Sequence, residues 1–401
     1  MNLIIIGETI GFPIGLAATA RVRCLAKALK REGHHITILN TIGLSEAYTT
    51  ARAKTSGVCQ EIPYLFCGGY SVRPGTKIQR LVEMIIGYAR SLFIIVTLKI
   101  TGKLDCILLY SRSLLMVRFF GMLCRILTLP FVIELCEWPE AIGATRGDHG
   151  PKPKQYSRAV ANNATAVIPI SHYIAGQVTQ LSQNKPIPSQ IIPILFDSEP
   201  LPGKGTEKYI LYTGSADYGD IWRIVLDSLA LLNERGLALE MVMTCSGKPA
   251  AVENLRRYVA EKNLGNQVRH LGYVDDDTFQ ELINSAAVLI APLPDNLQSI
   301  ARFPTKLAFF LASGRPVVTS AVGEIRYYLT DGENAFVTSS GCRPAEFAEK
   351  ISTIMMNCEN AEKIGLEGRK TAFENFYYKS QSRCLSDFLE NTVAAFKKSA
   401  R

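Results

Sequence analysis

The chain has 401 residues, of which 47% are hydrophobic and 20% are charged, and its formal net charge is +8. This length exceeds one ordinary hydrophobic core and predicts two domains, while the composition excludes a disordered chain. The ten cysteines stand singly, without a C-x-x-C pair, which disfavours a structural zinc site, and no secretory leader pattern is visible. We therefore expect a cytoplasmic protein with reduced thiols.

The excess positive charge lies in the first half of the chain. Residues 1–200 contain 21 Lys and Arg against 12 Asp and Glu, whereas the remaining residues contain 23 against 24. This asymmetry predicts an anionic partner for the first half, such as lipid phosphates, nucleic acid or an acidic substrate, although a basic surface that only aids solubility gives the same count. Because no recognised nucleic-acid-binding module is visible, we do not expect nucleic acid as a partner.

The chain opens with an apolar run over 1–7 that ends in glycine and predicts a buried parallel strand. A loop rich in glycine and proline follows at 11–16, then a helical pattern over 19–32 and a second strand over 35–40. This is the opening of a doubly wound domain, whose ligand binds at the carboxyl ends of the strands. The motif G-x-G-x-x-G is absent, which disfavours a dinucleotide.

A similar alternation of strands and helices restarts after the middle of the chain. The predicted strands lie at 208–214, 239–243, 268–273, 288–292 and 316–319, and the predicted helices at 221–236, 277–286 and 305–313. Two successive α/β domains, joined near 193–202, are therefore predicted.

The segment 77–130 is both apolar and basic. Charged residues interrupt it, so we expect no span of the roughly 20 apolar residues that a bilayer requires. Arg118 and Arg125, seven residues apart, fall on one helical face whose neighbours are Leu, Met and Phe. This pattern is typical of a helix lying on a membrane surface, and equally of a core helix whose arginines extend to solvent.

The second half contains five runs in a fixed order: VRHLGYV at 268–274, LINSAAVLIAP at 282–292, FPTKLAFFLASGRPVVTS at 303–320, GEIRYYL at 323–329 and DGENAF at 331–336. A strand ending G-x-V, a helix, an apolar strand ending in proline and a helix ending A-x-G-x-P-V-V succeed one another. This order resembles the donor-binding domain of the retaining glycosyltransferase family 4.

The resemblance implies the GT-B fold, an α/β architecture of two Rossmann-like, doubly wound parallel-sheet domains that face a cleft. Residues 1–195 would form the acceptor-binding domain and residues 203–375 the nucleotide-sugar-binding domain. A terminal helix at 376–401 would return to the first domain.

The resemblance also implies retaining transfer of a hexosyl or related unit from a nucleotide-diphosphate sugar. Neither a metal nor another cofactor is expected, because helix N-termini and basic side chains would neutralise the leaving diphosphate. With the apolar and basic segment 77–130, the resemblance predicts a lipid-linked or saccharide acceptor in bacterial-type surface polysaccharide synthesis. The enzyme would be cytoplasmic and would contact the inner face of an anionic membrane peripherally.

Residues around the start of the helix at 305–313 are the main donor-binding candidates. A proline just before a helix leaves N–H groups free to bind phosphate, and two flanking cations suit a diphosphate. An ordinary helix start with two solvated cations is the alternative interpretation. The candidates are Arg302, Pro304, Thr305 and Lys306.

Three further segments are expected to contact the donor nucleotide. The first follows the first strand of the domain, the second lies at the edge of the nucleotide base, and the third lies at the ribose. They are Gly214 with Ser215, then Gly272, Tyr273 and Val274, and finally Gly323 with Glu324. Members of the family carry two glutamates eight positions apart, whose places here are taken by Ala301 and Phe309. The alternative for Glu324 is a carboxylate at a helix N-terminus.

The first domain supplies the acceptor-side candidates. Gly11, Gly15 and Arg21 lie in the first loop and the following helix, where glycine lets the backbone approach an acceptor or a diphosphate. Glu137, with Glu134 beside it, is the candidate for orienting or deprotonating the acceptor hydroxyl. A carboxylate that caps the next turn is the alternative.

Two other functions fit parts of the pattern. The loss of both family glutamates suits a degenerate GT-B module that binds a nucleotide sugar or a partner without catalysis. A nucleotide-sugar epimerase shares the architecture, but the order of the motifs argues against it. Three aspartates at 275–277 suggest a metal site, yet they directly precede a predicted helix, so capping of that helix explains them better.

Overall fold

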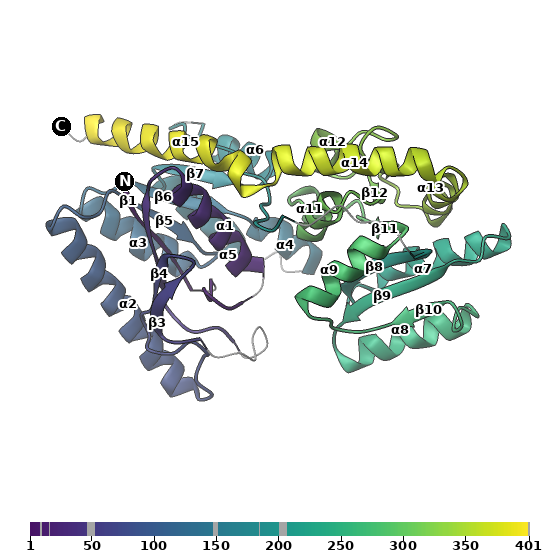
Figure 1. Ribbon diagram of the computed structural model, residues 1–401. Helices are drawn as coiled ribbons and strands as arrows, with labels where there is room; N and C mark the ends of the chain where they lie inside the picture. The colour runs from purple at the N-terminus through teal and green to yellow at the C-terminus, as the bar shows by residue number, and fades with distance from the viewer. Residues whose placement is uncertain are drawn as a thin grey trace. The chain divides into compact units, whose positions relative to one another are not determined.

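The computed structural model describes residues 1–8, 10–15, 17–45, 53–146, 151–183, 185–199 and 207–399. The chain folds into two units (Figure 1). Unit 1 contains Met1–Asp197 and Tyr377–Arg401, and unit 2 contains Ser198–Phe376. The predicted linker near 193–202 lies partly outside the described residues.

Unit 1 is built on a seven-stranded sheet with the strand order β3-β4-β2-β1-β5-β6-β7. Neighbouring strands run parallel, except that β3 and β4 are antiparallel. The order reverses between β1 and β5, so the sheet has a topological switch point there. The strands are β1 (Asn2–Gly7), β2 (His35–Asn40), β3 (Ser56–Cys59), β4 (Ile62–Phe66), β5 (Cys106–Tyr110), β6 (Phe131–Leu135) and β7 (Ala166–Pro169).

The helices of unit 1 connect these strands and pack on the sheet. They are α1 (Ala17–Arg31), α2 (Lys77–Ile100), α3 (Leu114–Ile126), α4 (Pro139–Arg146), α5 (Pro151–Asn163), α6 (His172–Leu181) and the last helix of the chain, α15 (Tyr378–Ser399).

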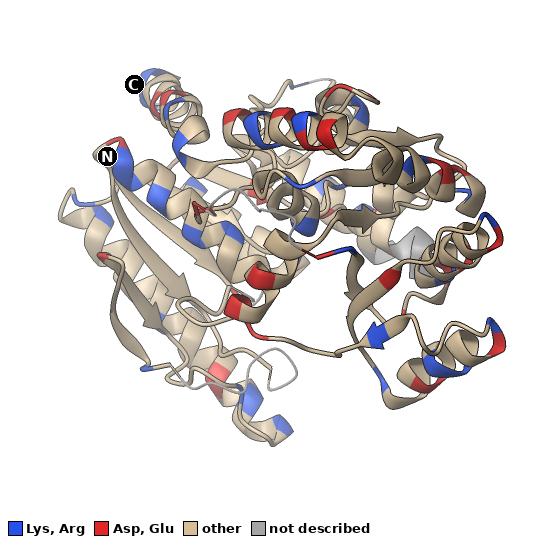
Figure 2. Ribbon diagram, turned by 45° about the vertical axis from the view of Figure 1, so that its right-hand side comes forward, with Lys and Arg blue, Asp and Glu red and all other residues tan. Residues whose placement is uncertain are grey.

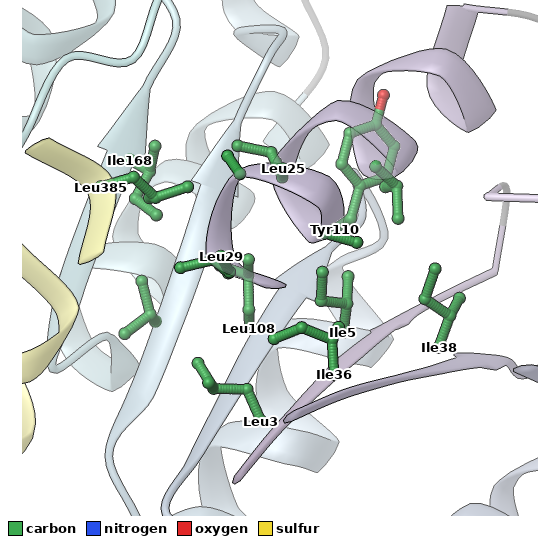
Figure 3. Packing of buried hydrophobic residues seen from close by; sticks show 14 of the residues in the cluster. Leu3, Ile5, Leu25, Leu29, Ile36, Ile38, Leu108, Tyr110, Ile168 and Leu385 are labelled. Carbon is green, nitrogen blue, oxygen red and sulfur yellow. The ribbon is translucent and has the colours of Figure 1, made fainter. Parts of the chain in front are cut away.

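The core of unit 1 joins the start and the end of the chain (Figure 3). Leu25 and Leu29 recur at helical spacing on α1 and pack with Leu3 of β1 in one buried cluster. Leu385 of α15 belongs to the same cluster, and α1 and α15 lie side by side (Figure 1). The last 22-residue helix is thus part of the hydrophobic core of the first unit.

Unit 2 is built on a six-stranded parallel sheet with the order β10-β9-β8-β11-β12-β13. Its strands are β8 (Tyr209–Ser215), β9 (Glu240–Ser246), β10 (Val268–His270), β11 (Val288–Ala291), β12 (Val317–Ser320) and β13 (Phe336–Thr338). Its helices are α7 (Gly219–Glu234), α8 (Pro249–Glu261), α9 (Asp276–Ser285), α10 (Leu297–Ile300), α11 (Thr305–Ala312), α12 (Ile325–Tyr328), α13 (Pro344–Met356) and α14 (Cys358–Asn375).

The predicted architecture of two parallel-sheet α/β units is confirmed. One predicted strand, at 268–273, is shorter than expected, because β10 ends at His270 and Gly272 adopts a φ of +71°. Left-handed backbone at that glycine turns the chain out of the sheet.

The expectation for the segment 77–130 is wrong in one respect. Within the described stretches, α2 is the one helix long and apolar enough to cross a membrane, judged by length and composition. The prediction failed because it treated each charged residue as an interruption, whereas a 24-residue helix tolerates two charges within a window of high mean hydropathy.

Candidate functional site

In unit 2, the loop before α11 and the end of β8 bring two cations together. The Nζ of Lys306 donates to the carbonyl oxygen of Thr213 at 2.5 Å and lies 4.9 Å from the centre of the Tyr212 ring. Burial, assisted by the nearby Arg302 guanidinium, lowers the pKa of Lys306 to about 8. Lys306 is therefore partly buried against β8, which disfavours the alternative interpretation of a solvated cation for this residue.

Neither cation has a carboxylate partner among the described residues. The Nε of Arg302 is buried without a hydrogen-bond partner within the same part of the chain. Two like charges at close range are unfavourable unless an anion neutralises them. Pro304 stands at the N-cap of α11 without a side-chain cap, so the first two N–H groups of the helix, those of Thr305 and Lys306, are available to the same anion.

The loop after β12 lies against the segment before Arg302. Gly323 adopts a φ of +56°, and a Cβ there would lie 2.7 Å from the Cα of Ile300. Only glycine allows this approach, and Glu324 is the next residue of the loop. Glu324 is 1% exposed and occupies the N-cap position of α12 without a side-chain cap hydrogen bond.

The two other donor segments lie at the ends of β8 and β10. Gly214 and Ser215 are the last residues of β8, and the Oγ of Ser215 accepts from the backbone N–H of Asp217 at 3.2 Å. Gly272 is in the loop after β10, followed by Tyr273, which is 80% exposed, and by the partly buried Val274. The structure does not place the side chain of Tyr273 in contact with the two cations.

The aspartates after β10 cap a helix. The carboxylate of Asp275 accepts from the backbone N–H of Thr278 at 2.8 Å and occupies the N-cap of α9. This hydrogen bond lowers the pKa of Asp275. The capping interpretation of the aspartate run is confirmed for this residue.

In unit 1, Arg21 and Glu134 form a buried ion pair rather than a substrate site. The Nε of Arg21 is 2.9 Å from Oε1 of Glu134, and the two side chains are 2% and 0% exposed. Arg21 also donates to the carbonyl oxygens of Ile192 and Pro193. The two side chains link α1, β6 and the segment after β7 inside the unit. The prediction that they contact a substrate is therefore wrong.

Glu137 remains accessible at the carboxyl end of β6. Its Oε2 lies 2.5 Å from Nη1 of Arg112, and the two side chains are 36% and 51% exposed. The thiol of Cys136, next to Glu137 in the chain, donates to the Tyr110 hydroxyl at 3.2 Å. Glu137 is thus held by a guanidinium while still facing solvent.

The first loop is folded back on β2. The side chain of Asn40 accepts from the N–H of Phe12 and donates to its carbonyl, both at 3.1 Å. Gly11 adopts a φ of +65° in this turn, and Gly15 is exposed. The two glycines therefore shape a fixed loop at the edge of the sheet.

The sequence prediction missed the groups that complete each site. In unit 2 these are the carbonyl of Thr213 and the ring of Tyr212, both of which contact Lys306. In unit 1 the missed group is Arg112, which pairs with Glu137. The position of Ser111 and Arg112 directly after an apolar strand was the available signal, since parallel strands present their ligands at carboxyl ends.

One protein-family model matches the chain, and the match lies within the second unit. Residues 207–357, which lie in unit 2, match the family model of Glycosyl transferases group 1. No curated protein sequence matches the chain.

Several solved structures share the whole fold. Sucrose-phosphate synthase from Thermosynechococcus elongatus aligns with a TM-score of 0.76 at 15% identity, covering 98% of this chain and 100% of that one. HepE from Anabaena in complex with UDP-glucose aligns with a TM-score of 0.69 at 15% identity, covering 98% and 100%. A glycosyltransferase from Rickettsia africae aligns with a TM-score of 0.66 at 12% identity, covering 97% and 99%.

The fold, extended over nearly the full length of these proteins, is that of the GT-B glycosyltransferases. Within the chain, the match to the Glycosyl transferases group 1 model covers most of unit 2. The resemblance stated from the sequence is therefore confirmed at the level of this fold and this group.

Proposed function

We propose that the protein transfers a hexosyl or related unit, with retention, from a nucleotide-diphosphate sugar to a lipid-linked acceptor in bacterial-type surface polysaccharide synthesis. In this proposal the enzyme works in the cytoplasm, at the inner face of an anionic membrane, and requires no metal. The observation that carries the donor part is the pair of cations in unit 2, Arg302 and Lys306, which have no carboxylate partner among the described residues.

A nucleoside diphosphate fits this pair by charge and by geometry. A guanidinium can donate to two phosphate oxygens, an ammonium supplies a second cation, and the N-terminus of α11 adds a partial positive charge. HepE of the same fold was solved in complex with UDP-glucose, which supports a nucleotide sugar as the donor here. Glu324, which follows Gly323 in the loop packed against Ile300, would accept from the ribose hydroxyls in place of the absent glutamates.

The proposed diphosphate site predicts a loss of affinity when its cations are removed. Arg302→Ala should weaken binding of the best-bound nucleoside diphosphate among UDP, GDP, ADP and dTDP by about 10–100-fold, and Lys306→Ala by a smaller factor in that range, because each removes a charge-assisted hydrogen bond. Calorimetric titration measures the dissociation constant. The affinity of the parent should also fall as the pH rises above about 8, since Lys306 then loses its proton.

The matched control for this titration is Arg257→Ala, which removes a highly exposed guanidinium from α8 of the same unit. It should bind nucleoside diphosphate like the parent. If Arg302→Ala and Lys306→Ala also bind like the parent, the phosphate site lies elsewhere.

The membrane part of the proposal rests on the reversed polarity of α2. Its inward stripe is Glu83, Gly87, Ser91 and Ile95, all buried. Its outward face is apolar, with Ile78, Leu81, Ile85 and Phe93 exposed by 53–77%. A surface helix of a soluble protein has the opposite arrangement, so this face suits a hydrocarbon environment.

The basic residues on α2 indicate that its partner is an anionic lipid surface and not an apolar surface of another protein. Lys77, Arg80, Arg90 and Lys99 lie along the same helix, and the first turns of α2 carry basic residues in Figure 2. α3 adds the exposed Leu115, Met122 and Ile126. Because the inward stripe packs on unit 1, we propose that α2 lies along the membrane surface and does not cross it.

This surface predicts binding to anionic vesicles. The parent should partition onto vesicles that contain phosphatidylglycerol more strongly than onto neutral phosphatidylcholine vesicles, and added salt should weaken binding, since exposed charges are screened over about 8–10 Å. Replacing both Ile85 and Phe93 with Asn should reduce partitioning by at least about tenfold, because each buried side chain contributes about 1.5–3 kcal/mol. Vesicle co-sedimentation measures this.

Leu366→Asn serves as the control, because Leu366 is 52% exposed on α14 in unit 2, outside this surface. It should partition like the parent. Equal partitioning onto neutral and anionic vesicles, or none onto either, rejects the membrane part of the proposal.

A further inference from the structure

The carboxyl ends of β1 and β5 in unit 1 hold a group of polar side chains that no function assigned so far uses. Glu8 follows β1 directly, and Ser111 follows β5 directly. These two strands flank the topological switch point of the sheet, where open α/β sheets bind their ligands. The Oγ of Ser111 lies 3.5 Å from Oε1 of Glu8, which is a long contact for a hydrogen bond.

Glu8 differs from the structural carboxylates of the same unit. Glu83 accepts from the N–H of Gly43 at 2.7 Å, and Glu134 accepts from Arg21 at 2.9 Å. Among the described residues, the hydrogen-bonding contacts of the Glu8 carboxyl group are to the hydroxyls of Ser111 and Ser113. Burial raises the pKa of Glu8, and nearby Ser113 and Arg73 oppose the shift without cancelling it. The fold therefore holds a buried carboxyl group here whose hydrogen-bonding contacts are hydroxyls, not a guanidinium or a backbone N–H.

Two groups near Glu8 lack hydrogen-bond partners within the described part of the chain. The Nε of Arg73 and the hydroxyl of Tyr88 are buried without a hydrogen-bond partner among the described residues. Burial raises the pKa of the Tyr88 hydroxyl, and the charge of Glu8 adds to this effect. Buried polar groups in native proteins are almost always hydrogen-bonded, so a guanidinium N–H and a hydroxyl without partners near the carboxyl group of Glu8 indicate an absent ligand.

The chemistry of the group identifies the class of that ligand. The guanidiniums of Arg73 and Arg112 both lie near Glu8, and Glu137 pairs with Arg112. Two cations and two carboxylates balance one another, so the group has no excess charge to attract a phosphate. Carboxylate acceptors, guanidinium donors and a hydroxyl together match the alternating donors and acceptors of a sugar.

We propose that Glu8, Arg73 and Tyr88 bind the sugar of the acceptor at the switch point of unit 1, with Glu8 accepting a hydrogen bond from one of its hydroxyl groups. This inference rests on the proposed function for the identity of the sugar as an acceptor, and adds the residues that recognise it. Ser111 positions Glu8, and its own backbone carbonyl accepts from the Tyr156 hydroxyl at 2.8 Å.

Binding of methyl glycosides tests the inference without an alkyl chain that would contact α2. Methyl glycosides of glucose, galactose, mannose and N-acetylglucosamine are titrated into the parent saturated with UDP, and binding is followed by saturation-transfer NMR. The parent should bind at least one of them. Glu8→Gln should weaken that binding by about 10–100-fold, because it removes a charged acceptor, and Tyr88→Phe by about 2–10-fold, because it removes only a hydroxyl.

Two controls separate a binding role from a structural one. Glu61→Gln changes an exposed glutamate in the turn between β3 and β4 and should bind the glycoside like the parent. UDP affinity should be the same in all four proteins, since the proposed donor site is in unit 2. Tyr88→Phe keeps the ring that packs on Phe119 and Phe120, so it remains informative even if Glu8→Gln does not fold.

The inference is overturned if the parent binds none of the glycosides, or if Glu8→Gln and Tyr88→Phe bind them as the parent does. A parent that binds the glycosides but no nucleoside diphosphate would instead reject the proposed donor function. The two failures are therefore distinguishable.

Discussion

Glu137→Gln should reduce glycosyl transfer by about 10²–10⁴-fold while the affinity for the donor stays unchanged. Glu137 lies just after β6, 36% exposed and paired with Arg112 at 2.5 Å. A carboxylate held in this way can accept the proton of an acceptor hydroxyl, whereas the isosteric amide cannot. Because Glu137 belongs to unit 1, the proposed diphosphate site in unit 2 should bind nucleotide as before.

Transfer and donor affinity have to be measured on the same protein sample. The matched control is again Glu61→Gln, which should transfer like the parent. Transfer by Glu137→Gln at the parental rate would remove Glu137 from the mechanism. No transfer by the parent with any donor and acceptor would favour the alternative of a non-catalytic module, for which the absence of carboxylates at Ala301 and Phe309 is the motivating observation.

The second large effect is a loss of stability when the buried ion pair between Arg21 and Glu134 in unit 1 is broken. Arg21→Met should destabilise unit 1 by about 3–5 kcal/mol, because it leaves the fully buried carboxylate of Glu134 without its cation. The double variant Arg21→Met with Glu134→Leu should be less destabilised than the single variant, since no buried charge then remains unpaired. Recovery should be incomplete, because the carbonyls of Ile192 and Pro193 also lose their donor.

The two tryptophans of the chain make this measurement specific to one unit. Trp138 is buried in unit 1 and Trp222 is buried in unit 2, so a Trp222→Phe background leaves one fluorescent reporter of unit 1. Urea unfolding in this background gives the free energy of unfolding. As a control, Arg383→Met breaks an exposed i,i+4 pair on α15 and should cost no more than about 1 kcal/mol. Equal effects of the two variants would contradict the buried-pair account.

The alternation of strands and helices was readable from the sequence because it depends on local patterns. Apolar runs of parallel strands and the spacing of Val22, Leu25 and Leu29 on α1 are properties of neighbouring residues. The helix start at Thr305 was readable for the same reason, since a proline before an apolar helical pattern marks a first turn.

The partners of the charged side chains could not be predicted from the sequence. Arg21 and Glu134 are 113 residues apart, and nothing in either local sequence shows that each neutralises the other. Lys306 was predicted as a donor-binding residue from its place at a helix start, but its contact with the carbonyl of Thr213, 93 residues earlier, could not be predicted. The reversed polarity of α2 was equally hidden, because the sequence shows which residues are apolar and not which face packs on the sheet.

Thermal unfolding in the presence of nucleotide sugars tests the central claim most directly. UDP-, GDP-, ADP- and dTDP-sugars are added separately to the parent and to Arg302→Ala, and the melting temperature is recorded against concentration. A ligand that binds only the native state stabilises it by RT ln(1 + [L]/Kd), about 2.7 kcal/mol at a concentration of 100 Kd. The account predicts that at least one nucleotide sugar raises the melting temperature of the parent, and that Arg302→Ala requires about 10–100-fold more of it for the same rise. No rise with any of the four, or the same rise in both proteins, would contradict it.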